Sequence, residues 1–293
     1  MDVGAQPLAR IRGFSLSVEG IHRLAIANAV ALTVIIASGA TVRLTNSGLG
    51  CLHWPGCTAA DPLPANGLHS YVEFGNRVVS AGTIFVTLIT WLLARGHRRL
   101  AGVIFCGTLA QAPLGALTVH FHLNPYFVMS HFLLSITVLT LAVILAARTV
   151  ERLPTQLPSW VPRLGLLVGL AALVLIVSGT LATAAGPHPG SVVVRRLWSF
   201  YPAVYWHVRA TAVFGVSFAL VLAYLIRVRA PQVRNALLLL GVLALQMTIG
   251  EVQYRTQLPW WLVIVHVVTA ATVWSAATAF VFSLWRPRRM ARG

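Results

Sequence analysis

Long apolar runs separated by short polar segments dominate the pattern of this chain. Each of eight runs contains roughly the 20 residues that a helix needs to cross a bilayer. They occupy 24–42, 72–94, 100–119, 127–147, 163–184, 204–226, 235–253 and 260–284. Glycine and serine inside several runs suit membrane helices, whose neighbours pack closely against small residues. The pattern therefore predicts an all-α membrane protein with eight transmembrane helices.

Composition strengthens this prediction. Of the 293 residues, 57% are hydrophobic and only 10% are charged, whereas about 25% of residues are charged in soluble domains. This much apolar surface cannot all be hidden in the core of a soluble protein. A bilayer provides the missing apolar environment.

The net charge of +16 comes entirely from arginine, since the chain contains no lysine. Most arginines lie in alternate loops: Arg10, Arg12, Arg23, Arg95, Arg98, Arg99, Arg148, Arg152, Arg227, Arg229, Arg234, Arg286, Arg288, Arg289 and Arg292. This is the positive-inside pattern of eight spans with both termini in the cytoplasm, as in a bacterial-type plasma membrane. Arg195 and Arg196 lie in an outer loop, either as ligand contacts or as a tolerated exception. No basic groove with interleaved aromatic residues remains outside the spans, which argues against nucleic acid as a partner.

Two short motifs recur along the chain. Gln111-Ala-Pro-Leu-Gly115 and Gln246-Met-Thr-Ile-Gly250 are 135 residues apart, as are His131 and His266. Ser38-Gly39 recurs as Ser178-Gly179 at an offset of 140. The alternative is chance similarity among apolar helices.

The motifs recur at a shared offset in helices that hold the same place in the two halves, which favours duplication of a four-helix unit. We therefore expect two pseudo-symmetric four-helix bundles, an N-terminal half 1–155 and a C-terminal half 156–293. Because each half has an even number of spans, the repeats keep the same direction through the membrane. Repeats of this kind are related by an axis along the membrane normal.

Three of the ten histidines, His131, His207 and His266, lie inside the predicted spans. An ionisable residue within a membrane helix usually faces the bundle and has a partner. His207 and His266 lie near the outer ends of two spans of the same half. Equal depth on two helices of one bundle is typical of bis-histidine ligation of haem iron. The alternative is a hydrogen-bonded structural pair.

The first half differs from the second. His131 has no histidine opposite, because Asn76 stands where span two should mirror His207. Asparagine is a poor iron ligand, so an iron here would have one protein ligand and an open position. Glu73 lies near the outer end of the same span, where a carboxylate is by default a functional candidate for proton transfer or for binding a cationic intermediate. It could instead only form an i,i+4 ion pair with Arg77.

The outer loop after the first span contains Cys51, His53 and Cys57. Five residues separate the two cysteines, and the loop faces the oxidising side, so a disulfide is plausible. A metal site is the alternative, although the loop offers no obvious fourth ligand. The loop residues alone leave both interpretations open.

These residues together resemble the haem A synthases of the respiratory chain, and the resemblance covers nearly the whole chain. Its motifs are Arg43-Leu-Thr-Asn-Ser-Gly-Leu-Gly-Cys51 with Trp54-Pro55 and Cys57, Glu73-x-x-x-Arg77, Gln111-x-x-Leu-Gly115-x-x-Thr-Val119, Ser178-Gly-Thr-Leu-Ala-Thr-Ala-Ala-Gly186-Pro-His188-Pro-Gly190, His207, Gly250-x-x-Gln253-Tyr254 and Val265-His266. The most specific of these are the segment that begins at Arg43 and the segment that runs from Ser178 to Gly190, whereas single histidines are not specific. One position departs from the family: Asn76 replaces the histidine of its common Glu-x-x-His-Arg motif.

The resemblance implies an activity: oxidation of the C8 methyl of haem O to a formyl group, giving haem A for cytochrome c oxidase. It implies haem b in the second half with His207 and His266 as axial ligands. In the first half it implies a haem O substrate site with Glu73 and His131 as catalytic residues, His131 also contacting the iron.

The resemblance also implies a Cys51–Cys57 disulfide. Arg43 and Arg77, like the outer-loop Arg195 and Arg196, are candidate contacts for haem propionates. The implied partners are haem O, an unidentified electron donor, membrane lipid, haem O synthase and cytochrome c oxidase assembly factors.

Two other functions fit parts of the pattern. A dihaem electron-transfer protein of the cytochrome b561 type should show two complete histidine pairs, and Asn76 argues against it. A transporter would account for parallel repeats. Transporters more often have polar residues near the membrane midplane, whereas the polar residues of this chain gather at the outer ends of the spans.

Overall fold

The computed structural model describes residues 17–59, 61–64, 67–150, 157–191 and 196–285. Within these ranges the chain forms eight α-helices and one short 3-10 helix. They are α1 Val18–Leu44, α2 Leu68–Leu93, η1 Arg95–His97, α3 Arg98–His120, α4 Pro125–Arg148, α5 Trp160–Ala185, α6 Phe200–Arg227, α7 Val233–Arg255 and α8 Trp260–Leu284. Each α-helix is long and apolar enough to cross a membrane. The prediction of eight helical spans is confirmed.

Most helices extend beyond the predicted apolar runs, and in α1 polar residues cap and continue the helix. The helix α1 begins at Val18, six residues before the predicted run, and its cap Ser17 accepts a hydrogen bond from Gly20 N at 3.1 Å. In its first turn Arg23 pairs with Glu19 at 2.8 Å. Hydropathy detects the hydrocarbon-spanning part of a helix, whereas caps and i,i+4 pairs extend it toward water.

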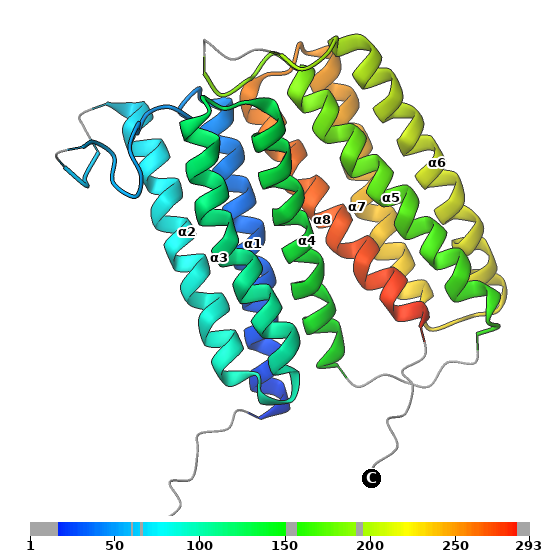
Figure 1. Ribbon diagram of the computed structural model, residues 1–293. Coiled ribbons are helices and arrows are strands. Elements are labelled where there is room, and N and C mark those ends of the chain that lie inside the picture. The colour runs from blue at the N-terminus through cyan, green and yellow to red at the C-terminus, as the bar shows by residue number, and fades with distance from the viewer. Residues whose placement is uncertain (1–16, 60, 65–66, 151–156, 192–195, 286–293) are drawn as a thin grey trace, which may run out of the picture.

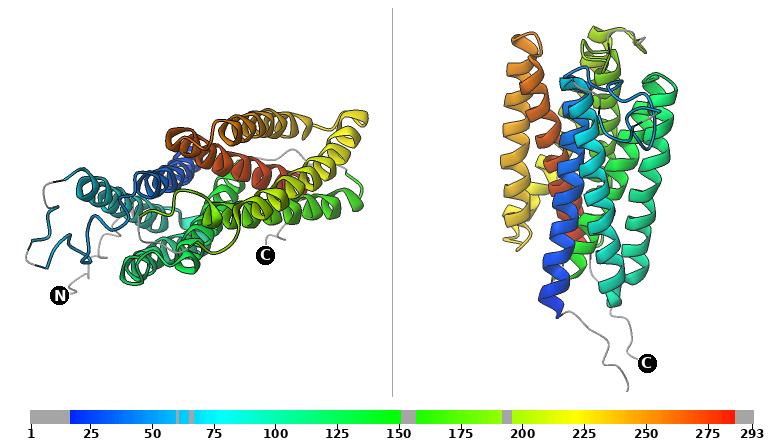
Figure 2. Two further views of the ribbon diagram at one scale, coloured as in Figure 1. Left: turned by 90° about the horizontal axis from the view of Figure 1, so that it is seen from above. Right: turned by 90° about the vertical axis from the view of Figure 1, so that its left-hand side faces the viewer.

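The helices form two bundles that lie side by side, α1–α4 and α5–α8 (Figures 1 and 2). Each bundle has its own buried apolar cluster. The helices α1, α4, α5 and α8 make the contacts between the bundles. Near the middle of α8, Trp274 Nε1 donates a hydrogen bond to Thr140 Oγ1 of α4 at 2.7 Å. The expected boundary between the halves, after residue 155, lies outside the described residues.

The turns α3–α4 and α7–α8 repeat the same backbone geometry. His122 and Leu123 have φ of 50° and 58°, and Gln257 and Leu258 have φ of 63° and 59°. In each turn the leucine N–H donates to the carbonyl five residues earlier, at 2.8 and 2.7 Å. This is the hydrogen bond that closes a helix in the Schellman motif. The turns are 135 residues apart, the offset of the sequence motifs, so the backbone supports the internal repeat.

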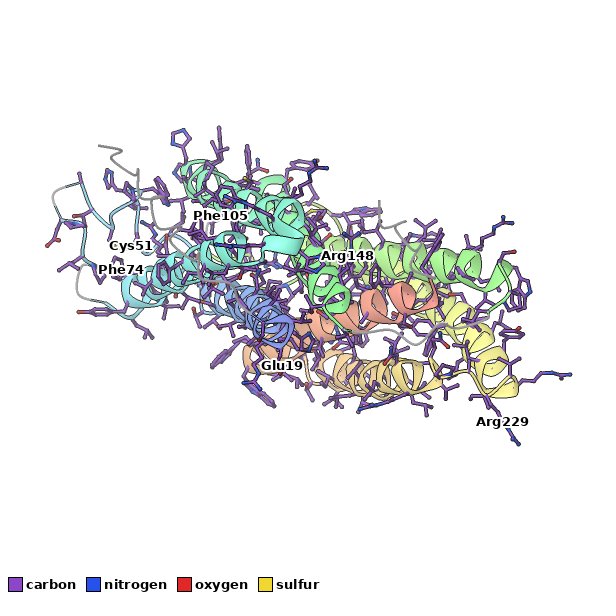
Figure 3. The ribbon with its side chains drawn as sticks, turned by 90° about the horizontal axis from the view of Figure 1, so that it is seen from below. Glu19, Cys51, Phe74, Phe105, Arg148 and Arg229 are labelled. Atoms are coloured by element: carbon purple, nitrogen blue, oxygen red, sulfur yellow. A yellow bond between two sulfur atoms is a disulfide. The ribbon has the colours of Figure 1, made fainter. Side chains whose placement is uncertain are left out.

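The two ends of the molecule differ in character. The loops α1–α2, α3–α4, α5–α6 and α7–α8 lie at one end, here called the disulfide end, at the top of Figure 1. The opposite end, here called the arginine-rich end, carries Arg95, Arg98, Arg99, Arg148, Arg227, Arg229 and Arg234. Figure 3 views the molecule from the arginine-rich end.

Candidate functional site

One polar side chain on each even-numbered helix lies over a glycine of the helix before it. The pairs are Asn76 with Gly39, His131 with Gly115, His207 with Gly179, and His266 with Gly250. All four polar residues lie six to eight residues into their helices from the disulfide end. The sequence indicated equal depth for two of them, and the structure shows one arrangement repeated four times.

The glycines allow the imidazole rings to lie close to the neighbouring backbone. A Cβ added at Gly179 would lie 3.1 Å from His207 Cε1, and one at Gly250 would lie 3.2 Å from His266 Cε1. The same atom at Gly115 would lie 3.6 Å from His131 Cε1. The first two distances are tighter than ordinary van der Waals contact, so a larger residue would displace those rings.

Both second-half histidines have side-chain partners that orient them. Ser178 Oγ lies 3.1 Å from His207 Nδ1. Gln246 Nε2 lies 3.2 Å and 3.1 Å from the two ring nitrogens of His266, and Thr269 donates to the Gln246 carbonyl oxygen. A ligating imidazole needs one nitrogen for the metal, and a partner on the other fixes its orientation. Ser178 is placed in this way on His207.

The first half contains buried polar atoms without hydrogen-bond partners. Among the described residues they include Asn76 Oδ1, His131 Nδ1 and Gln111 Oε1, besides both side-chain polar atoms of Asn28 and the Nε of Arg43. The amide nitrogen of Gln111 donates to Ser135 Oγ at 2.8 Å, so that side chain is anchored while its oxygen stays free. Buried polar atoms are nearly always satisfied in native proteins, and exceptions call for an explanation. Unpartnered atoms beside a glycine-backed imidazole suit a flat ligand with a metal centre.

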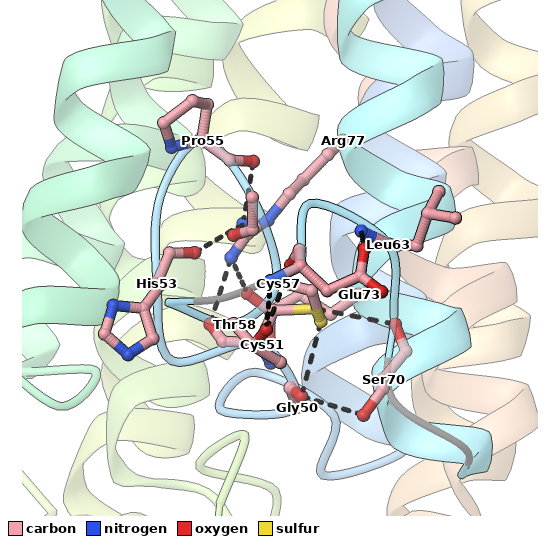
Figure 4. The surroundings of a disulfide bond; sticks show 12 residues. Gly50, Cys51, His53, Pro55, Cys57, Thr58, Leu63, Ser70, Glu73 and Arg77 are labelled. Carbon is pink, nitrogen blue, oxygen red and sulfur yellow. Dashed lines mark hydrogen bonds and ion pairs between the residues drawn. A yellow bond between two sulfur atoms is a disulfide. The ribbon is translucent and has the colours of Figure 1, made fainter.

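Glu73 and Arg77 hold the α1–α2 loop, as Figure 4 shows. Glu73 is only 4% exposed. Its Oε2 accepts from Cys51 N at 2.8 Å, and its Oε1 accepts from Arg77 Nη2 at 2.7 Å. The i,i+4 ion pair considered for these residues is therefore present, and the carboxylate is also tied to the loop backbone.

The guanidinium of Arg77 is surrounded by loop carbonyls. It donates to the carbonyls of His53 at 2.7 Å, Gly56 at 2.5 Å and Cys51 at 3.0 Å, and to that of Pro55 at 3.2 Å. Both terminal nitrogens are occupied by these bonds and by Glu73. Arg77 therefore acts as the anchor of the loop.

Cys51 and Cys57 form a disulfide within this loop. Both cysteines are buried. The bond rules out the alternative in which the two thiols and His53 bind a metal. Among the described residues, no group of three or more His, Cys, Asp or Glu side chains is arranged to hold a metal ion.

Replacing Arg77 with glutamine should destabilise the protein, because it leaves the Glu73 carboxylate buried without its partner. We expect a loss of about 3 kcal/mol in the free energy of unfolding, measured by denaturation in detergent. The control is Arg255→Gln, since Arg255 pairs with Glu251 at i,i+4 with side chains 76% and 59% exposed. Exposed pairs contribute about 0.5 kcal/mol or less. Equal losses in both variants would contradict the anchoring role.

The other arginine candidates lie at the disulfide end. Arg43 Nη2 donates to the carbonyl of Thr183 at 2.5 Å, which links α1 to α5, while its buried Nε has no partner. Arg196 donates to the carbonyls of Gly186 and Pro187 in the α5–α6 loop. Arg195 lies outside the described residues. Of the described arginine candidates, Arg43 is the one with a buried donor that has no partner.

The sequence model of the COX15-CtaA family, described as cytochrome oxidase assembly protein, matches residues 22–278. The chain belongs to the COX15-CtaA family. This match covers all eight helices except the ends of α1 and α8, and it confirms the resemblance on which the site residues were chosen.

Several relatives of this COX15-CtaA member are named heme A synthase. The chain is 34% identical to the protein of Geobacillus kaustophilus over 153 residues, which is 48% of each chain. It is 33% identical to that of Geobacillus thermodenitrificans over 149 residues, 47% of each chain. The match to the Shewanella oneidensis protein is 26% identical over 306 residues, 86% of this chain and 93% of the relative. The chain thus spans about half the length of the two Geobacillus relatives that it matches.

Sequence reasoning singled out the histidines of this COX15-CtaA chain but missed the side chains that hold them. Ser178 and Gln246 were recognised only as parts of repeated motifs. In the structure these motifs place a hydrogen-bonding side chain and a glycine against each second-half imidazole. The repeat itself was the signal, because residues recurring at one offset in equivalent helices mark equivalent sites.

Proposed function

We propose that this chain is a haem A synthase, which oxidises the C8 methyl group of haem O to a formyl group and so makes haem A for cytochrome c oxidase. The observation that carries this proposal is an asymmetry between two equivalent sites in a member of this family. One half holds two oriented histidines, and the other holds one histidine opposite an asparagine. A fixed cofactor suits the first arrangement and a substrate suits the second.

The C-terminal half, 156–293, holds haem b in this proposal. His207 and His266 would hold its iron, with Ser178 and Gln246 orienting the two imidazoles. A bis-histidine haem supplies electron transfer. The glycines Gly179 and Gly250 allow the rings to approach the helix backbones closely.

The N-terminal half, 1–155, binds haem O as substrate. His131 contacts its iron from α4, and Asn76 faces the site from α2 without supplying a strong ligand. Glu73 lies three residues before Asn76 on the same helix, and we assign it to ring orientation or proton transfer. Its bond to Cys51 N–H couples this role to the disulfide loop.

Haem propionates fit the disulfide end, where the candidate contacts Arg43, Arg77 and Arg196 lie. Arg43 is the favoured contact, since its buried Nε is unused. Arg77 was an equal candidate from the sequence, but its terminal nitrogens already bind loop carbonyls and Glu73. Arginine is well suited to carboxylates because its planar fork can donate two parallel hydrogen bonds.

We place the protein in a bacterial-type plasma membrane with its arginine-rich end and both termini in the cytoplasm. The positive-inside rule supports this orientation, and so does a disulfide at the opposite end, where the compartment is oxidising. Its partners would be haem O synthase, an electron donor and cytochrome c oxidase assembly factors.

The test is pigment analysis of membranes that contain the protein and are supplied with haem O. We expect wild-type protein to yield haem A, and Glu73→Gln and His131→Ala to lower the yield at least tenfold. His22→Gln is the matched control, because His22 lies at the arginine-rich end, where it hydrogen-bonds Thr149. Normal haem A formation by both site variants would refute the assignment. A dihaem electron carrier would form no haem A at all.

A further inference from the structure

A groove opens at the arginine-rich end of the first bundle. It has a volume of about 1190 Å³ and lies between the end of α2, η1, the start of α3 and the end of α4. Its lining includes Arg95, Arg98, Arg99, Arg148, Trp91 and Val103. The haem sites proposed above are near the opposite end of the helices, so the groove belongs to neither.

The mouth of the groove carries an unneutralised positive charge. The side chains of Arg95, Arg98, Arg99 and Arg148 are all exposed. Within the described part of the chain, no aspartate or glutamate lines the groove. Among the described residues, none of the four arginines forms an ion pair. Such a cluster raises the local concentration of anions.

The floor of the groove is apolar and extends toward the middle of α3. Val103 is 56% exposed, and Cys106 is also exposed. At 1.5 Å per residue, Cys106 lies about 12 Å along the helix axis from Arg98. On the α2 side, the Trp91 indole stacks on Phe105 with ring centroids 5.3 Å apart. The groove therefore joins a cationic mouth to an apolar channel at membrane depth.

We propose that this groove binds an anionic phospholipid. The arginines contact its phosphate, and one acyl chain lies along Val103 and Cys106. Basic pockets between transmembrane helices on the cytoplasmic side bind lipid headgroups in this way, and guanidinium groups form charge-assisted hydrogen bonds with phosphate. The proposal requires only that the chain spans a membrane, so it stands independently of the haem chemistry.

The positive-inside rule accounts for arginines at this end but not for the groove beside them. The second bundle offers the comparison, with Arg227, Arg229 and Arg234 at the same end. At the offset of 135 residues, Leu237 and Val242 stand where the groove has Gly102 and Gly107. In the first bundle these glycines let Trp91 and Val138 lie close to α3, since a Cβ at Gly102 would lie 2.9 Å from Trp91 Nε1 and one at Gly107 would lie 2.7 Å from Val138 Cγ2. Figure 3 shows Arg229 far from Arg148 and Phe105.

The test is lipid retention by the purified full-length protein in neutral detergent, measured by native mass spectrometry. Phosphatidylglycerol is titrated against phosphatidylcholine, with inorganic phosphate as competitor. We expect one phosphatidylglycerol to be retained at least tenfold more tightly than phosphatidylcholine, and millimolar phosphate not to displace it. The triple variant Arg95→Gln, Arg98→Gln, Arg99→Gln should lose this preference. The matched triple Arg227→Gln, Arg229→Gln, Arg234→Gln should keep it.

Three results would overturn the proposal: equal retention of the two lipids, equal loss in both triple variants, or full displacement by phosphate. The last would indicate an anion site without a lipid chain. If the first triple variant fails to fold, Val103→Trp tests the floor instead, because the indole would fill the channel without altering the arginines. Unchanged phosphatidylglycerol binding by Val103→Trp would likewise overturn it.

Discussion

Replacing His266 or His207 with alanine is expected to abolish the spectrum of a six-coordinate low-spin haem. The physical reason is that two imidazoles create the strong axial field, and the structure offers no substitute ligand among their contacts. Gln246 and Thr269 surround His266, and Ser178 accompanies His207. Neither an amide nor a hydroxyl is a comparable ligand for ferric iron. The measurement is the optical and electron paramagnetic resonance spectrum of purified protein.

The control for this prediction is His131→Ala. His131 occupies the equivalent position in the first half, 135 residues earlier, so its loss removes an imidazole of similar burial and depth. We expect His131→Ala to retain the low-spin signal while failing to bind haem O. A low-spin spectrum in both His207→Ala and His266→Ala would place haem b elsewhere in the molecule.

Replacing Asn76 with histidine is expected to change the spin state of haem O bound in the first half. Asn76 lies against Gly39 of the preceding helix, as His207 lies against Gly179. A Cβ at Gly39 would lie 4.0 Å from Asn76 Oδ1, so the backbone leaves room for a larger ring. With a second imidazole available, the iron should become six-coordinate and low-spin, whereas we expect the single histidine of the wild type to leave it high-spin.

Asn76→Ala serves as the control for this second prediction, since it removes the amide without offering a ligand. Its spectrum should stay high-spin when haem O is added. The family commonly has histidine at this position, so Asn76→His should still form haem A. An unchanged high-spin spectrum in Asn76→His would mean that α2 does not face the iron.

The fold could be predicted well from the sequence because a single physical requirement dominates it. Apolar runs of bilayer length gave all eight helices, and the run 260–284 coincides with α8. The largest difference was at α1, where Ser17 and the Glu19–Arg23 pair extend the helix beyond the apolar region. These are local interactions, and hydropathy does not register them.

The site could be predicted only in part, for reasons that depend on residue type. A histidine in an apolar run is conspicuous, so the three candidates for iron contact stood out. The role of Arg77 could not be read in the same way, because its partners are mostly backbone carbonyls of a folded loop. Likewise, the bond from Arg43 to Thr183 joins residues 140 positions apart and exists only once the bundles pack.

The hydrogen bond from Arg43 to the Thr183 carbonyl also bears on why the two halves differ. Arg43 and Thr183 are related by the offset of 140 that relates Ser38-Gly39 to Ser178-Gly179, so equivalent positions of the two halves meet. In a symmetric dimer of separate four-helix chains, the residue at this position would face its own copy. Two arginines would then bring like charges together. A fused chain is free of that restriction, and the same freedom allows Asn76 in one half and His207 in the other.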